Sequence, residues 1–133
     1  MHIFVSYTLR DGVLCVDRLA DLATSLTAFG SPYVDVLHNR AEDPQSYVLQ
    51  QLAESELVVA CKTPAFFESP WVLIEMSAAT ARRLPILFIT IEPRHTKSRL
   101  FEIIITNALV HHNLAGWRAR TNRTLQLTGF VSG

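Results

Sequence analysis

Hydrophobic residues in this chain gather in short, nearly uninterrupted runs. The runs cover residues 3–7, 33–37, 57–61 and 86–91. Each run is rich in β-branched or aromatic residues and is bounded by polar or turn-forming residues, so each predicts a β-strand. The last two runs lack the alternation of a half-exposed strand, which is typical of parallel strands covered on both faces.

The segments between these runs predict helices. Residues 19–26 place leucine and alanine at i, i+3, i+4 and i+7, the spacing of one buried helix face. Two pairs, Asp43-Pro44 and Ser69-Pro70, each combine an N-cap residue with proline at the first helical position. They predict helices that run to about residues 55 and 83.

The alternation of strands and helices predicts an α/β fold, with a parallel sheet covered by helices on both faces and right-handed crossovers. Ligands of such sheets bind beyond the carboxyl ends of the strands, near the point where strand order reverses. We therefore expect residues 6–11, 37–43 and 62–71 to surround one crevice.

The pattern after residue 92 is less regular. Residues 100–105 fit either a helix or a strand, residues 108–111 fit a short fifth strand, and residues 121–130 fit a closing helix. Because no repeat, linker or low-complexity segment interrupts the sequence, we expect residues 1–133 to form a single domain.

Composition narrows the possible partners. The chain is 49% hydrophobic and 18% charged, which predicts a folded core, and its 12 basic and 12 acidic residues give no net charge. We therefore expect neither nucleic acid nor a membrane as partner, and no hydrophobic run approaches the roughly 20 residues of a membrane helix. The two cysteines, Cys15 and Cys61, lack any metal-ligand spacing, so we expect free thiols, no metal and a reducing, cytoplasmic location.

Trp71 and Glu75 are the most informative pair. Four residues apart in a predicted helix, they share one face. Glu75 lies inside the otherwise hydrophobic run 71–79, which predicts a buried carboxylate. Such an acid either pairs with a base such as Arg82 or serves a function.

Four segments, in this order, resemble a TIR (Toll/interleukin-1 receptor) domain between about residues 2 and 92. They are 3–7 with the polar turn 10–12, the strand 33–36, the helix and strand 47–63, and 67–75, which is similar to the family segment Y-x-x-S-x-W-C-x-x-E. The resemblance implies a flavodoxin-like fold, a five-stranded parallel sheet in the order 2-1-3-4-5. The loop 41–44 departs from the family because it lacks the usual Pro-Gly pair.

Many TIR domains cleave NAD⁺ at the nicotinamide–ribose bond, and the resemblance assigns the catalytic carboxylate to Glu75. Breaking this bond builds positive charge on the ribose, which a nearby carboxylate stabilises. Nicotinamide leaves without a general acid, so one glutamate can suffice. The family also places an aromatic residue and an arginine after the first strand, here Tyr7 and Arg10, where an arginine suits a pyrophosphate.

Other residues are candidates for substrate binding, each with a structural alternative. Ser6 lies beside Tyr7 at the expected crevice, and Asp35 either orders the crevice through hydrogen bonds or points outward from an edge strand. Trp71 forms a wall of the site or anchors the core. Phe66 stacks on a substrate ring or pins its loop to the core.

The resemblance thus implies a TIR enzyme with NAD⁺ as substrate and no cofactor. Its products are nicotinamide and ADP-ribose, or a cyclic ADP-ribose isomer. A stand-alone chain resembles microbial immune-signalling proteins in antiviral defence, and the family's enzymes commonly form homo-oligomers. The alternatives are a non-catalytic TIR–TIR adaptor and a nucleoside deoxyribosyltransferase-like enzyme, whose Asp-Gly-Thr lead-in is missing here.

Overall fold

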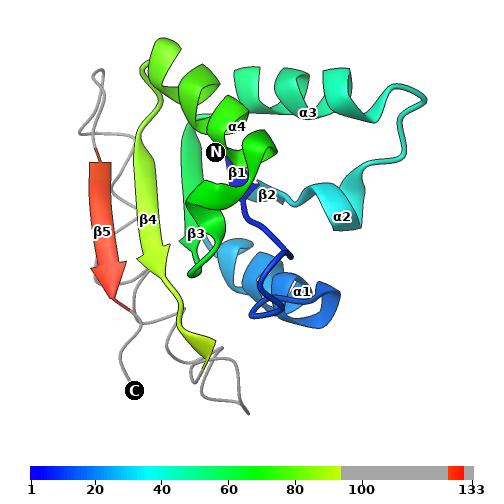
Figure 1. Ribbon diagram of the computed structural model, residues 1–133. Helices are drawn as coiled ribbons and strands as arrows, with labels where there is room; N and C mark the ends of the chain where they lie inside the picture. The colour runs from blue at the N-terminus through cyan, green and yellow to red at the C-terminus, as the bar shows by residue number, and fades with distance from the viewer. Residues whose placement is uncertain (94–125, 131–133) are drawn as a thin grey trace.

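A parallel sheet with helices on both faces forms the framework of the chain (Figure 1). The computed structural model describes residues 1–93 and 126–130. Four parallel strands lie in the order β2-β1-β3-β4. Their bounds are His2–Ser6 (β1), Ser31–Tyr33 (β2), Leu57–Lys62 (β3) and Ile86–Thr90 (β4). The predicted α/β class with a parallel sheet is confirmed.

The helices divide between the two faces of the sheet. Helix α1 lies on the side opposite to α3 and α4, and a short 3₁₀ turn, η1, leads into α4 (Figure 1). The bounds are Val16–Leu26 (α1), Asp35–His38 (α2), Pro44–Ala53 (α3), Phe66–Glu68 (η1) and Pro70–Ala81 (α4). Because successive strand residues face opposite sides, Ile3 and Val5 pack in the cluster that contains α1, whereas Phe4 packs with α3 and α4.

Both predicted cap-and-proline signals mark the start of a helix. Asp43 accepts a hydrogen bond from the backbone N–H of Ser46 at the start of α3. Ser69 accepts one from the N–H of Val72 at the start of α4, the helix that carries Glu75. These two helix starts are confirmed. The second one determines where the helix that carries Glu75 begins.

The predicted strand over residues 33–37 is wrong beyond Tyr33. Strand β2 ends there, and the N–H groups of Leu37 and His38 both donate to the carbonyl oxygen of Val34, as in a helical turn. The ring Nδ1 of His38 accepts from the N–H of Val34, and Asp35 pairs with a side chain four residues later. These side-chain bonds offset the strand preference of the β-branched residues.

Residues 126–130 are also not helical, which corrects that part of the predicted closing helix. Gln126–Phe130 form β5, which pairs in parallel with β4. Glycine at position 129 weakens a helix, and β4 offers a row of backbone hydrogen-bonding groups for a strand. The predictions for residues 100–105, 108–111 and 121–125 lie outside the described residues.

Two further expectations concern the cysteines and membrane-spanning helices. Both cysteines are free: Cys15 is exposed, and Cys61 is buried in β3, where burial raises its pKa to about 12. Within residues 1–93 and 126–130, no helix combines the length and the apolar character that crossing a bilayer would require.

Phe66 and Phe67 provide a matched test of the core next to α4. Phe66 is 0% exposed and Phe67 is 46% exposed. We expect Phe66→Ala to lower the free energy of unfolding by about 3–5 kcal/mol because it empties a buried site. Phe67→Ala should cost less than about 1 kcal/mol, as surface substitutions usually do. Urea unfolding of both variants measures the difference, and equal losses would contradict the packing described here.

Candidate functional site

Glu75 is a buried acid in the second turn of α4. It is 5% exposed, and its Oε1 accepts a hydrogen bond of 2.7 Å from the Oγ of Ser6 at the end of β1. Within residues 1–93 no ion pair joins Glu75 to a base, and Arg82 lies at the C-cap of the same helix. The alternative of a carboxylate locked to Arg82 therefore does not hold.

The surroundings of Glu75 make it a weak acid. Burial raises the pKa of Glu75 from 4.5 to about 7, because a desolvated carboxylate is costly. The hydrogen bond from Ser6 opposes this change, the negative charge of Asp35 adds to it, and a hydrogen bond from Trp71 opposes it. At neutral pH the carboxyl is therefore about equally divided between its neutral and ionised forms.

Tyr7 lies in the same electrostatic neighbourhood. Burial raises its pKa to about 12, a hydrogen bond from the N–H of Val36 acts against this, and the charges of Asp35 and Glu75 raise the pKa further. The phenol oxygen accepts from Val36 at 2.9 Å, which ties the end of β1 to helix α2. Tyr7, Asp35 and Glu75 thus interact electrostatically although Tyr7 follows β1, Asp35 lies in α2 and Glu75 lies in α4.

Asp35 sits at the first position of α2 instead of within a strand. Its Oδ1 accepts hydrogen bonds from the hydroxyl of Tyr33 and from the side-chain amide of Asn39, at 3.0 and 2.7 Å. The same amide donates to the carbonyl oxygen of Pro44. Asp35 therefore orders the loop beside the site through hydrogen bonds, which is the first of the two predicted alternatives.

Arg10 and Asp11 join the loop after β1 to the loop after β3. The Oδ2 of Asp11 accepts from the N–H of Ala65 at 2.8 Å, and its Oδ1 accepts from the N–H of Val13. Partial burial raises the pKa of Asp11, but these hydrogen bonds outweigh it and the net change is downward. The guanidinium of Arg10 donates to the carbonyl oxygen of Glu68, just before α4 begins.

Trp71 packs against the core, which is one of the two roles considered for it, and it also borders a pocket whose lining residues do not include Glu75. It is half-buried against the core cluster that contains α3 and α4, and it lines a small pocket of about 170 Å³. The other lining residues are Asp35, Pro44, Gln45 and Val48. The pocket is large enough for a small ring but not for a dinucleotide.

Two predicted binding residues lie inside the protein. Ser6 and Phe66 are both 0% exposed. The side chain of Ser6 contacts Glu75 and not solvent. Phe66 anchors its loop to the core, which is the structural alternative considered for it. Phe67, next to it, is exposed, with the ammonium of Lys62 5.8 Å from its ring centroid and the ring of Phe88 6.2 Å away.

Sequence reasoning missed Asn39 and the linking role of Asp11. Asn39 follows Asp35 by four residues, a spacing that would have been informative only if the helical turn had been recognised. Asp11 precedes the turn residue Gly12, whose φ is 70°, so an Asx turn was detectable there. The hydrogen bond between Asp11 and Ala65 joins residues 54 positions apart, so no short stretch of sequence could have predicted it.

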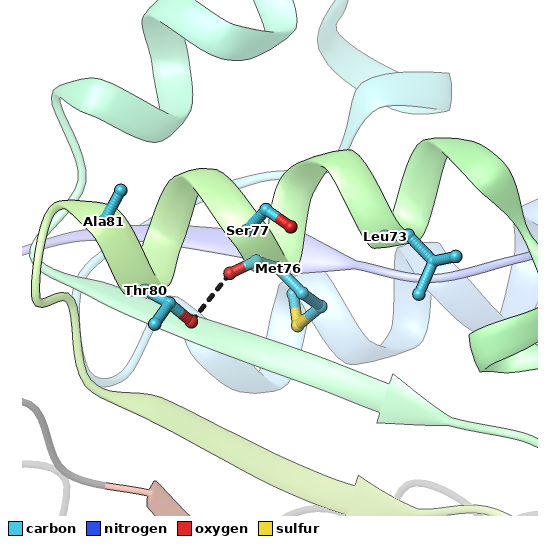
Figure 2. Close-up of a pocket in the computed structure, with 5 residues that line it drawn as sticks. All are labelled: Leu73, Met76, Ser77, Thr80 and Ala81. Carbon is cyan, nitrogen blue, oxygen red and sulfur yellow. Dashed lines mark hydrogen bonds between the residues drawn. The ribbon is translucent and has the colours of Figure 1, made fainter.

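A second hollow lies along α4, which carries its described lining residues. Figure 2 shows the side chains that line it, all from this one helix. They are Leu73, Met76, Ser77, Thr80 and Ala81, and the hollow measures about 480 Å³. None of these side chains carries a charge, so this surface suits an apolar contact better than a charged substrate.

Chemically, the site offers one buried carboxylate, a neutral phenol, an indole and a nearby guanidinium. In the part of the chain that the structure describes, no group of three metal-ligating side chains is present. Comparison with known proteins adds no family: no family model matches the sequence, and no curated protein matches it either.

The raised pKa of Glu75 predicts a pH-dependent stability that is independent of any enzymatic activity. Between pH 4.5 and about 7 the folded state holds a proton that the unfolded chain has released, so this stabilisation is lost as pH rises through about 7. We expect Glu75→Gln to gain about 3 kcal/mol relative to the natural chain between pH 4 and pH 9. Urea unfolding across this range measures the gain.

Glu54 supplies the control, because it is an exposed glutamate at the end of α3. Glu54→Gln removes the same charge without a desolvated carboxylate. If both variants follow the same pH dependence, the burial of Glu75 does not control its protonation.

Proposed function

We propose that this chain is a TIR-type enzyme that cleaves NAD⁺ at the nicotinamide–ribose bond. The observation that carries the proposal is the buried carboxylate of Glu75, 5% exposed and held by Ser6 at the carboxyl end of β1. A buried acid with no base beside it in residues 1–93 has a high free-energy cost, which a catalytic role would explain. The proposal includes the flavodoxin-like, five-stranded order 2-1-3-4-5.

In the proposed reaction the bond between ribose C1′ and the nicotinamide nitrogen breaks, and its electron pair stays with that nitrogen. Ionised Glu75 stabilises the positive charge that develops on the ribose. Water then adds to C1′ and releases a proton, which gives ADP-ribose. Attack by a hydroxyl or an adenine nitrogen of the same molecule would give a cyclic isomer instead.

The neighbours of Glu75 have supporting roles in this proposal. Tyr7 and Trp71 flank the carboxylate, and the guanidinium of Arg10 binds the pyrophosphate. Because the pocket beside Trp71 holds only about 170 Å³, the rest of the dinucleotide would extend over the strand-end loops. We further propose a cytoplasmic homo-oligomer that produces an immune signal in antiviral defence.

A second candidate is a non-catalytic interaction module, and one observation favours it. Leu73 and Ile74 on α4 are 49% and 45% exposed, and Leu73 also lines the hollow of Figure 2, whose described lining residues carry no charge. Apolar surface of this kind marks contact sites in many proteins. In that case the chain would bind other TIR domains, and Glu75 would have no chemical role.

Nicotinamide release from NAD⁺ tests the first proposal. We expect the natural chain to release nicotinamide, and Glu75→Gln to lose at least about 100-fold in kcat, because the amide cannot supply the negative charge. Chromatography over a series of protein concentrations, with a crowding agent, measures turnover and separates ADP-ribose from a cyclic isomer.

The exposed Glu54→Gln variant is again the matched control and should keep full activity. Equal turnover by the natural chain and Glu75→Gln would exclude Glu75 as the catalyst. If the natural chain leaves NAD⁺ intact at every concentration, the interaction module becomes the better reading. Consumption of a deoxynucleoside instead of NAD⁺ would point to a deoxyribosyltransferase-like enzyme.

Arg10 gives an independent test of where the substrate binds. Loss of charge-assisted hydrogen bonds to phosphate should raise the KM of Arg10→Ala for NAD⁺ about ten-fold and change kcat by less than about two-fold. Arg82→Ala removes an exposed arginine at the other end of α4 and should change neither constant. Steady-state kinetics of the two variants decides this, and an unchanged KM in Arg10→Ala would place the phosphates elsewhere.

A further inference from the structure

The hydroxyl of Ser6 is a polar group in an otherwise hydrophobic place. Ser6 is 0% exposed and ends β1 directly after three buried hydrophobic residues, Ile3, Phe4 and Val5. It is paired with Ala60 in the register of the central strands. A hydroxyl buried there costs free energy unless it is hydrogen-bonded, whereas alanine would fill the position without that cost.

The partner of this hydroxyl is the carboxyl of Glu75, 69 residues later in the chain. The Oγ–Oε1 distance of 2.7 Å is typical of a strong hydrogen bond between a hydroxyl and a carboxylate. Ser6 belongs to the middle of the sheet, and Glu75 to the helix packed over it. The bond therefore fixes one carboxyl oxygen to the end of a strand in the interior of the described sheet.

We infer that Ser6 is a positioning residue: its hydroxyl, together with the hydrogen bond from the Trp71 side chain, holds the Glu75 carboxylate in one orientation toward the substrate. The catalytic consequence rests on the proposed NAD⁺ cleavage, whereas the contact itself does not. Ser6 has no exposed surface in the structure, so it acts through Glu75 and does not touch the substrate.

The hydrogen bond also favours the charged form of the carboxyl. Two titratable groups face Glu75 from neighbouring elements: Asp35 from α2, whose charge raises the pKa of Glu75, and Tyr7, whose own pKa is about 12 and which therefore stays neutral. The hydrogen bond from Ser6 lowers the pKa of Glu75, whereas burial and the charge of Asp35 raise it. Without it, Glu75 would be ionised only at higher pH.

The first test is a direct titration of Glu75 by ¹³C NMR of its side-chain carboxyl. In Ser6→Ala we expect the midpoint to rise by about one pH unit, because a hydrogen bond to the charged form is lost. Ser77→Ala removes a hydroxyl from an exposed position on the same helix and should leave the midpoint unchanged. An unchanged midpoint in Ser6→Ala would overturn the inference.

The second test is the pH profile of NAD⁺ cleavage. A one-unit rise from a pKa of about 7 lowers the ionised fraction at pH 7 about five-fold, so the loss in kcat of Ser6→Ala should be about five-fold greater at pH 7 than at about pH 9, where both carboxyls are ionised. Any loss that remains at about pH 9 measures the lost orientation of the carboxylate. A loss that is equal at every pH would show a merely structural role and would overturn the inference.

Three further outcomes are distinguishable. If Ser6→Ala does not fold, as judged by circular dichroism, Ser6→Cys keeps a side chain of similar size with only a weak donor, and the same upward shift is expected. If the natural chain shows no turnover but the midpoint shifts, the proposed enzymatic function fails while the contact that orients Glu75 is supported. An unshifted midpoint with normal turnover would overturn the positioning role alone.

Discussion

The buried hydrogen bond between Ser6 and Glu75 is the contact that gives this fold a candidate site. It joins the end of the central strand β1 to the second turn of α4, and both partners are buried, Ser6 fully and Glu75 with 5% of its surface exposed. The sheet and the helix would form without a carboxylate in this place, since their clusters are hydrophobic on both faces. The acid is therefore an addition to the core that weakens it at neutral and alkaline pH.

Hydrogen bonds hold together the loops around Glu75, the residue whose burial lowers the stability of the core. Asp11 links the loop after β1 to the loop that leads into η1, and Tyr7 links β1 to α2. Asn39 and Asp35 hold the next loop. Such contacts keep the walls around Glu75 in fixed positions, which is the arrangement that electrostatic stabilisation of a developing charge requires.

Local signals predicted the framework well. Cap-and-proline pairs gave the starts of α3 and α4, because both residues act within one turn of the helix. Position 35 was misjudged because valine and tyrosine favour a strand, while the bonds that bend the chain there come from His38 and Asn39, side chains later in sequence. The strand at residues 126–130 was missed because its pairing with β4 depends on an edge about 40 residues earlier.

The candidate site shows more clearly the same difference between local signals and contacts between residues far apart in the sequence. Glu75 stood out because a charge inside a hydrophobic helix is visible in a short window, and its partner Ser6 did not, because 69 residues separate them. The reading of Ser6 as a substrate ligand followed from its place at a strand end, yet alternation along the strand puts its side chain on the same face as Phe4, where α4 covers it. Residue type singled out Glu75, and only the packing of α4 on the sheet shows which side chains border the strand-end loops and which, like Ser6, lie buried behind them.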